Sequence, residues 1–357
     1  MVERSGADRN TFETFVGRAA GRRAVVACAA DAAGMAAGEL ARRHLVAAGC
    51  PEPQIIIPGK GELLTGRRLA DRARAAGAEA LLALDLGATA EALLPGVAML
   101  FIDSHRHQAN LDAPVIEPRR SRAAPAGVTL FRLLRSSGDA EPLRWLAAVA
   151  ADAGHPKVDP PRPAPGAKTP YGKSALREVS VLLNAAGRSS DPQTDAALAL
   201  LARADGPVAM LADVSDELAR LWEARAEVMR EVGHWSRTRP RFMWRVALVP
   251  VASPCRIEPV IAAMWERQLG QYMIVAANSG YVPGTVTVVT RTASPARNLL
   301  RLLDAVTPEG LDEPIALGRR DYVEAAIPRE AWKAMLRKMR FRRVKDLVPP
   351  PHEARLF

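Results

Sequence analysis

The chain has 357 residues, of which 48% are hydrophobic and 25% charged, and its 49 Lys and Arg side chains exceed its 39 Asp and Glu side chains by ten. This composition is typical of globular proteins, the length suits two domains, and no apolar run reaches the roughly eighteen residues that a membrane span needs. Three scattered cysteines exclude a disulfide framework and favour the cytoplasm, and the positive charge favours an acidic partner, nucleic acid first.

The N-terminal half alternates short apolar runs with longer helical segments. Four runs predict strands, at 23–28, 54–57, 80–84 and 97–102. Helices are predicted between them at 35–48 and 67–76. Continuous apolar strands separated by helices indicate a parallel sheet that is covered on both faces. Ligands of such sheets bind beyond the carboxyl ends of the strands, where Asp31, Asp85 and Asp103 lie.

The rest of the chain predicts a linker, a helical stretch and a second α/β region. The linker is the proline-rich segment 156–168, and apolar residues at helical spacing follow it over 174–235. Further strands are predicted at 244–251, 272–277 and 285–290, with helices at 260–268 and 296–305. We therefore predict three parts, namely 1–173, 174–236 and 237–357.

Short acidic motifs occur in a fixed order along the N-terminal half. Asp31-Ala32-Ala33-Gly34 follows the first predicted strand, Asp85-Leu86-Gly87 the third, and Asp103-Ser104-His105 the fourth. Asp152 lies near the end of an apolar helix, and Asn184-Ala185-Ala186-Gly187-Arg188 comes after the linker. In this order the motifs resemble those of the DHH phosphoesterase superfamily, in particular its RecJ-like branch.

The C-terminal part resembles the DHH-associated domain of the same proteins. The glycine turn at 278–284 and the strand that ends at Arg291 carry this resemblance, which covers about residues 20–345 in all. It implies an α/β fold in which a parallel-sheet DHH lobe and a smaller α/β DHH-associated lobe are joined by a long helix, with a cleft between them.

The resemblance also implies which residues perform chemistry. Members of the family bind two divalent cations, usually Mn²⁺, and a metal-bound hydroxide attacks phosphorus while both ions absorb the developing charge. The implied metal ligands are Asp31, Asp85, Asp103 and Asp152. The implied catalytic residue is His105. The implied substrate-binding residues are Arg188, Asn278, Arg291, Gly318, Arg319 and Arg320. The acidic residues could instead be helix caps or turns at strand ends, where Asp is favoured anyway.

Several positions depart from the pattern of the family. Ala33 stands where the family has a second aspartate, Ser104 stands where it has the first histidine of Asp-His-His, and Gly318-Arg319-Arg320 replaces Gly-Gly-His. The missing aspartate and histidine would each be a metal ligand. We therefore expect Mn²⁺ or Mg²⁺ to bind weakly or not at all, because a cation that loses ligands is left open to water.

Two basic clusters contain aromatic residues. Segment 329–345 has eight basic residues against one acid, with Trp332 among them, and segment 237–245 combines four arginines with Phe242 and Trp244. Such clusters predict tracking of phosphates and stacking on bases, although a basic surface can be merely solvated and both tryptophans could belong to a core.

We consider three functions. The first is a RecJ-like protein that binds single-stranded nucleic acid in the interlobe cleft with little or no phosphodiesterase activity, and with replication or repair proteins as further partners. The second is an active manganese-dependent phosphodiesterase or exonuclease that acts on nucleic acid or a small nucleotide. The third is a scaffold that binds other proteins. Ligand loss favours the first over the second, and the basic clusters favour it over the third.

Overall fold

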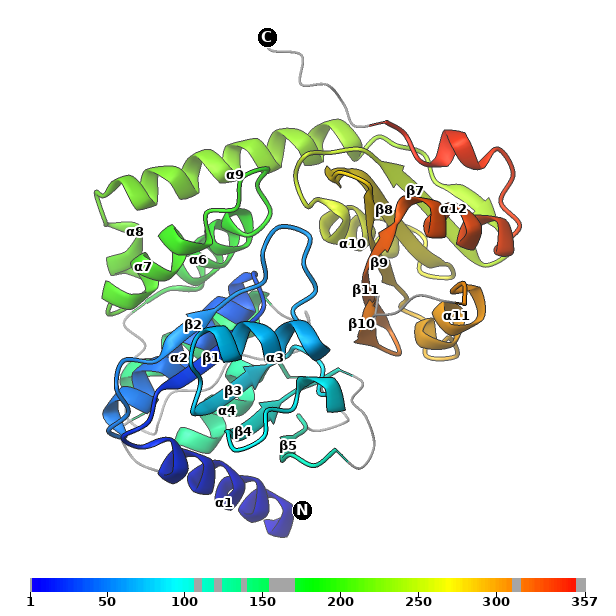
Figure 1. The fold of residues 1–357 in the computed structure, drawn as a ribbon. Helices are drawn as coiled ribbons and strands as arrows, with labels where there is room; N and C mark the ends of the chain where they lie inside the picture. The colour runs from blue at the N-terminus through cyan, green and yellow to red at the C-terminus, as the bar shows by residue number, and fades with distance from the viewer. Residues whose placement is uncertain are drawn as a thin grey trace. The chain divides into compact units, whose positions relative to one another are not determined.

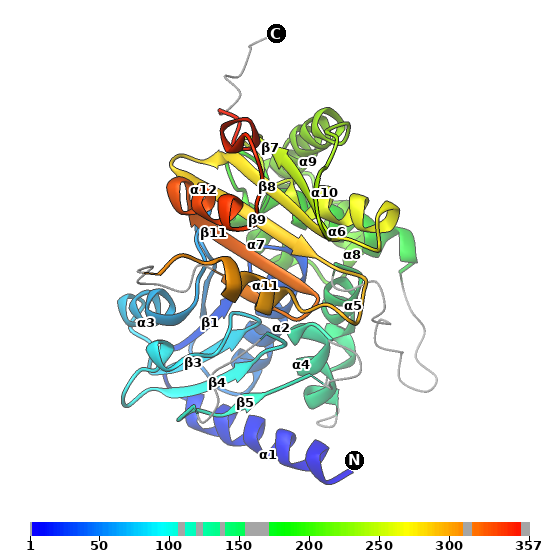
Figure 2. The same ribbon diagram turned by 90° about the vertical axis from the view of Figure 1, so that its right-hand side faces the viewer.

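The computed structural model describes residues 2–105, 111–118, 124–135, 140–153, 171–309 and 316–350. The chain forms two compact units (Figures 1 and 2). Unit 1 comprises Met1–Pro58, Leu64–Gly187 and Gln193–Trp222. Unit 2 comprises Gly59–Leu63, Arg188–Pro192 and Glu223–Phe357. The predicted linker at 156–168 lies outside the described residues.

Unit 1 is built on a five-stranded parallel sheet in the order β2-β1-β3-β4-β5. Its strands are β1 Ala24–Cys28, β2 Gln54–Ile56, β3 Ala80–Leu84, β4 Ala98–Ile102 and β5 Val115–Ile116. The first four coincide with the predicted strands to within one residue, so the predicted parallel sheet is confirmed. The two-residue strand β5 is too short for a sequence pattern to reveal.

Alternate strand residues point to opposite faces of this sheet, and both faces are apolar. Helices cover each of them. Val26, Leu82 and Leu100 belong to one core, and Leu81 and Phe101 belong to the other. On the first face, α2 Ala32–Ala47 contacts β1, β2 and β3, and α4 Ala126–Leu134 contacts β4. Four further helices pack against these helices or one another in the same core, namely α5 Arg144–Ala153, α6 Lys173–Ala186, α7 Thr194–Arg203 and α8 Pro207–Leu211. On the second face lie α3 Gly66–Ala75 and the short helix η1 Ala90–Ala92. A further helix, α1 Val2–Ala19, contacts β4 and was not predicted.

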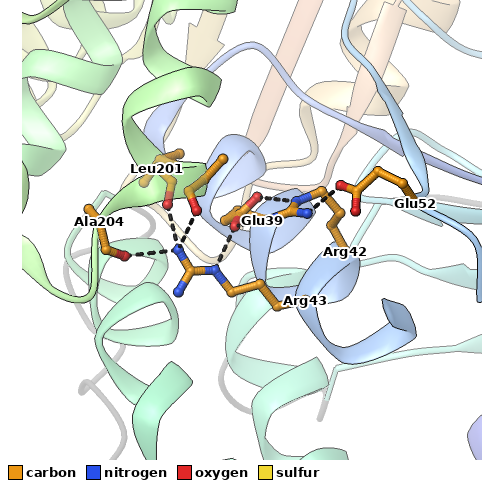
Figure 3. Close-up of polar contacts among 7 residues, drawn as sticks. Glu39, Arg42, Arg43, Glu52, Leu201 and Ala204 are labelled. Atoms are coloured by element: carbon orange, nitrogen blue, oxygen red, sulfur yellow. Dashed lines mark hydrogen bonds and ion pairs between the residues drawn. The ribbon is translucent and has the colours of Figure 1, made fainter. Parts of the chain in front are cut away.

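A buried acid in α2 fixes the end of α7 (Figure 3). Glu39 is 1% exposed, and its carboxylate accepts hydrogen bonds from Arg42 Nε at 2.7 Å and Arg43 Nε at 2.6 Å. Arg43 also donates to the carbonyl oxygens of Leu201 and Ala204, which have no partner further along α7. The network therefore joins two helices that are about 160 residues apart in sequence.

Breaking this network should lower the free energy of unfolding. Glu39→Ala leaves two arginines without their shared buried partner, and we expect the free energy of unfolding to fall by about 3 kcal/mol in urea denaturation. The matched control is Glu52→Ala, which removes a 67% exposed partner of Arg42 and should cost less than about 1 kcal/mol. Equal losses in the two variants would show that the buried carboxylate has no special structural role.

Unit 2 contains a six-stranded mixed sheet in the order β10-β11-β9-β8-β7-β6. Its strands are β6 Arg241–Met243, β7 Val246–Val251, β8 Met273–Val282, β9 Thr285–Arg291, β10 Ala316–Arg319 and β11 Tyr322–Pro328. Only β7 and β8 are parallel to each other. The predicted strands correspond to β7, β8 and β9, whereas β6, β10 and β11 were missed because they are short or only half apolar.

The helices of unit 2 include the basic segment that the sequence singled out. They are α10 Glu258–Gln268, α11 Leu299–Val306, α12 Arg329–Lys338 and the short η4 Val344–Leu347. Trp332 of α12 is buried in the core beside Met335 and Leu336, so the core alternative holds for this tryptophan. Trp244 is 76% exposed and does not belong to a core.

The predicted helical stretch at 174–235 consists of α6, α7, α8 and α9, the last spanning Asp216–Trp235. The division between the units falls within α9, at Trp222. Within the described part of the chain, no helix combines the length and the apolar character that crossing a membrane requires.

Candidate functional site

Three of the predicted site residues meet at the carboxyl edge of the parallel sheet. Asp85 directly follows β3, Asp103 directly follows β4, and these strands are neighbours. Asp85, Asp103 and His105 each place one ligand atom within 4.8 Å of the others. They are the one such group of three among His, Cys, Asp and Glu side chains within the described ranges. We call these three residues the acidic triad.

Asp85 is held in place by the backbone and by Ser104. Its φ of 55° lies in the left-handed region, which is unfavourable for a residue with a side chain and often marks a functional position. Its Oδ1 accepts hydrogen bonds from Ser104 N at 3.0 Å and from Ser104 Oγ at 2.9 Å. Its Oδ2 accepts from the first amide of α4, Ala126 N, at 2.6 Å. Both carboxylate oxygens therefore have protein donors.

Both carboxylate oxygens of Asp103 likewise accept hydrogen bonds from the protein. Asp103 is buried, and its Oδ1 accepts a hydrogen bond from His105 N at 2.7 Å and lies 3.0 Å from His105 Nδ1. Its Oδ2 accepts from the amide of Gly87, in the motif that follows β3. The imidazole of His105 is therefore oriented by a buried carboxylate.

Burial raises the pKa of Asp85, and the nearby Asp103 carboxylate raises it further. His105 and the amides of Ala126 and Ser104 act in the opposite direction, because they stabilise the charged form. The triad is thus a closed cluster in which each carboxylate oxygen already accepts a hydrogen bond.

Asp31 and Asp152 do not join the acidic triad. The side chain of Asp31 caps α2 and accepts a hydrogen bond from Gly34 N at 2.8 Å. Asp152 is exposed near the end of α5. Among the predicted ligands, the structure groups Asp85 and Asp103 in the triad. Asp31 follows β1, the neighbour of β3, and so lies at the same carboxyl edge of the sheet outside the triad, whereas Asp152 lies on α5.

The predicted Asn184–Arg188 motif packs against the turn that contains Asp31. Asn184 Oδ1 accepts a hydrogen bond from Ala32 N at 3.3 Å. A side chain on Gly187 would lie 1.8 Å from the carbonyl oxygen of Ala30, so only glycine fits there. Two motifs that are more than 150 residues apart thus support each other within unit 1.

Two of the predicted substrate-binding arginines make cation–π contacts with the same aromatic ring in unit 2. The guanidinium groups of Arg291 and Arg319 lie 5.4 and 5.7 Å from the ring centroid of Tyr322. Each also has an acidic partner, Glu266 at 2.9 Å for Arg291 and Asp321 at 2.8 Å for Arg319. Their charge is therefore partly neutralised within unit 2.

The other predicted positions are held by the backbone. Gly318 faces β11 so closely that a side chain would lie 2.4 Å from the carbonyl oxygen of Tyr322. Arg320 is exposed and donates to the carbonyl oxygens of Pro295 and Arg297. The half-buried Arg188 accepts a hydrogen bond at its carbonyl oxygen from the amide of Arg256.

Asn278 is fully buried in β8, and its amide group is used inside unit 2. Its Oδ1 accepts hydrogen bonds from Ser253 N at 2.9 Å and Gly280 N at 3.1 Å, and its Nδ2 donates to Cys255 O at 2.9 Å. Asn278 therefore shapes the turn that follows β7.

The comparisons with known proteins agree with this geometry at the level of the fold. No family model and no curated protein sequence matches the chain. Among solved structures, exonuclease RecJ bound to manganese superposes with a TM-score of 0.63 and 18% identity, covering 93% of this chain and 92% of the chain in that structure.

The chain has a RecJ-like DHH fold.

Other solved structures have the same fold. RecJ of Thermus thermophilus in complex with Mn²⁺ gives a TM-score of 0.61 at 17% identity, covering 96% of this chain and 55% of that one. CDC45 from Entamoeba histolytica gives 0.55 at 8% identity, covering 94% and 99%. The predicted fold class, a parallel-sheet lobe with a second α/β lobe, is thereby confirmed.

Two features of this RecJ-like chain were missed in the sequence. Arg256 lies 3.8 Å from the buried Glu258 and also pairs with Glu324 of β11, 68 residues away. The guanidinium of Arg340 lies 5.4 Å from the ring centroid of Trp244. Neither pair has a sequence signal, because the partners meet only through the packing of the sheet. The sequence indicated the basic clusters at 237–245 and 329–345, but it did not predict that they contact each other through Arg340 and Trp244.

Proposed function

We propose that this RecJ-like chain binds single-stranded nucleic acid and has little or no phosphodiesterase activity. The observation that carries the proposal is the closed acidic triad, whose four carboxylate oxygens all accept hydrogen bonds from protein donors. In particular, Ser104 donates to Asp85 at the position where the family motif has a metal-binding histidine.

A pair of divalent cations does not fit these residues. Each ion requires several oxygen or imidazole ligands, and two such sites share only a few carboxylates. Ala33 offers no ligand, and Asp31 and Asp152 are not part of the triad. A single Mn²⁺ or Mg²⁺ ion would have to share these carboxylate oxygens with the hydrogen bonds from Ser104, His105 and Ala126, which leave fewer lone pairs for the metal. We therefore expect binding at about millimolar strength or weaker.

Exposed basic side chains in unit 2 support nucleic acid as the ligand. They are Arg237, Arg239, Arg241, Arg245, Arg337, Lys338, Arg340, Arg342, Arg343 and Lys345. Such a surface attracts phosphates whatever the base sequence. RecJ, one of the structures with this fold, is an exonuclease. Replication or repair proteins as further partners belong to the same proposal.

The alternative is an active manganese-dependent phosphodiesterase or exonuclease. The pairing of His105 Nδ1 with Asp103, at 3.0 Å, favours it, since a buried carboxylate can orient an imidazole for proton transfer. The RecJ structures that contain manganese favour it as well.

The cleavage assay separates the two. We expect end-labelled single-stranded DNA to stay intact in the presence of Mn²⁺ or Mg²⁺, because a two-ion clamp that stabilises the attacking and leaving oxygens is missing. Release of mononucleotides by the purified protein, abolished in Asp85→Ala, would establish the alternative. Cleavage that persists in Asp85→Ala would come from a contaminating nuclease.

A further inference from the structure

The hairpin that joins β6 to β7 has an unusual residue at its tip. Met243 pairs with Val246, so the turn consists of Trp244 and Arg245 alone. Trp244 adopts a φ of 54°, in the left-handed region where such turns favour Asn or Gly. An aromatic residue in this conformation is strained, and backbone strain of this kind often accompanies function.

The tip presents aromatic surface to solvent. Trp244 is 76% exposed, and Phe242, two residues earlier on the edge strand, is 51% exposed. The ring of Phe242 lies 5.0 Å from that of Tyr272, which supports it from the loop before β8. Large exposed aromatic side chains that lie close together commonly mark a binding surface.

Positive charge surrounds these rings. The guanidinium of Arg340 lies 5.4 Å from the ring centroid of Trp244, and the φ of Arg340 is also left-handed, at 65°. Arg241 and Arg245 flank the aromatic residues on the hairpin and are exposed. Neither 236–245 nor 337–345 contains an acidic residue. The aromatic surface therefore suits a polyanion that also carries flat, unpaired rings.

We propose that Trp244 and Phe242 form a stacking platform for the bases of a single strand, while Arg340, Arg241 and Arg245 contact its phosphates. The proposal rests on the proposed function and assigns the bases of the ligand to one hairpin of unit 2. Every base has a π-face, so the platform accepts any sequence, whereas a duplex keeps its bases stacked on one another.

The test exploits the left-handed φ of Trp244. In Trp244→Asn the turn receives a residue that suits its backbone, so the melting temperature should stay the same or rise. Loss of one base–aromatic stack should weaken binding of a fluorescent fifteen-residue oligothymidylate by about 5- to 150-fold at about 50 mM salt. The slope of log affinity against log salt should not change, because no phosphate contact is lost. Trp244→Phe should retain most of the affinity.

Trp222→Ala is the matched control, because it removes another exposed tryptophan, on α9, and should leave binding unchanged. If Trp244→Asn binds as tightly as the unmodified protein, the platform is overturned and the proposed function stands. If the unmodified protein binds no strand, both fail. If Trp244→Asn alters only the sedimentation coefficient, the hairpin is a protein interface and the platform is again overturned.

Discussion

Removing five basic residues from the end of α12 and the segment after it should reduce the salt dependence of nucleic-acid binding. The changes are Arg337→Ser, Lys338→Ser, Arg342→Ser, Arg340→Asn and Arg343→Asn. Asparagine is chosen at the last two positions because their φ values, 65° and 51°, are left-handed. All five side chains are exposed, so the fold should tolerate the changes.

The size of the effect follows from counterion release. Each phosphate neutralised on a single strand contributes about −0.7 to the slope of log affinity against log salt. Four or five contacts give a slope of about −3, so the affinity of the unmodified protein should fall about sixtyfold between 50 and 200 mM salt. The five-residue variant should show a clearly shallower slope, to which Arg241 and Arg245 still contribute, and weaker binding to all sequences. Anisotropy titrations at three salt concentrations measure both quantities.

The matched control removes the same charge from exposed positions of unit 1. It replaces Arg9, Arg18, Arg22, Arg67 and Arg220 with serine. If net charge alone drives binding, both variants lose affinity equally. If the unit 2 surface binds the strand, the control variant keeps nearly the original slope. Equal losses would contradict the assignment of the interface to unit 2.

Restoring two metal ligands should raise the affinity for Mn²⁺ by about two to three orders of magnitude. Ala33→Asp adds a carboxylate in the first turn of α2, where a negative charge is favourable. Ser104→His adds an imidazole and removes the hydroxyl that donates to Asp85 Oδ1. Isothermal titration calorimetry of the double variant with Mn²⁺ measures the change.

Ser104→Ala is the control for this experiment, because it removes the hydroxyl donor to Asp85 Oδ1 without supplying a ligand, while the amide of residue 104 still donates to that oxygen. We expect it to gain at most a few-fold in affinity. No gain in the double variant would mean that the carboxyl edge of the sheet has diverged beyond its ligands. Two tight sites in the unmodified protein would overturn the account of the closed triad.

Much of the fold could be predicted because the central strands of unit 1 are buried on both faces and are therefore continuously apolar. Strands β10 and β11 escaped prediction because they lack such an apolar run: β10 has four residues and includes Gly318 and Arg319, and β11 contains Glu324. Helix α1 was missed because its apolar face is narrow and its remaining residues are polar.

The site was predictable only in part. Asp85 and Asp103 were indicated because the carboxyl ends of neighbouring parallel strands meet at one edge, and His105 was implied by the resemblance to the Asp-His-His motif. Sequence could show neither that Ser104 donates to Asp85 nor that Asp85 adopts a left-handed φ. Nor could it show that the amide of Ala126, which lies 41 residues after Asp85 in the chain, donates a hydrogen bond to the same carboxylate.

We expect this RecJ-like chain to bind a single strand without cutting it. A gel-shift experiment at about 50 mM salt, with an end-labelled oligonucleotide and added Mn²⁺, tests it in one reaction. The account predicts a shifted band from which the intact oligonucleotide is recovered after deproteinisation. Absence of a shift, or mononucleotide release that Asp85→Ala abolishes, would contradict it.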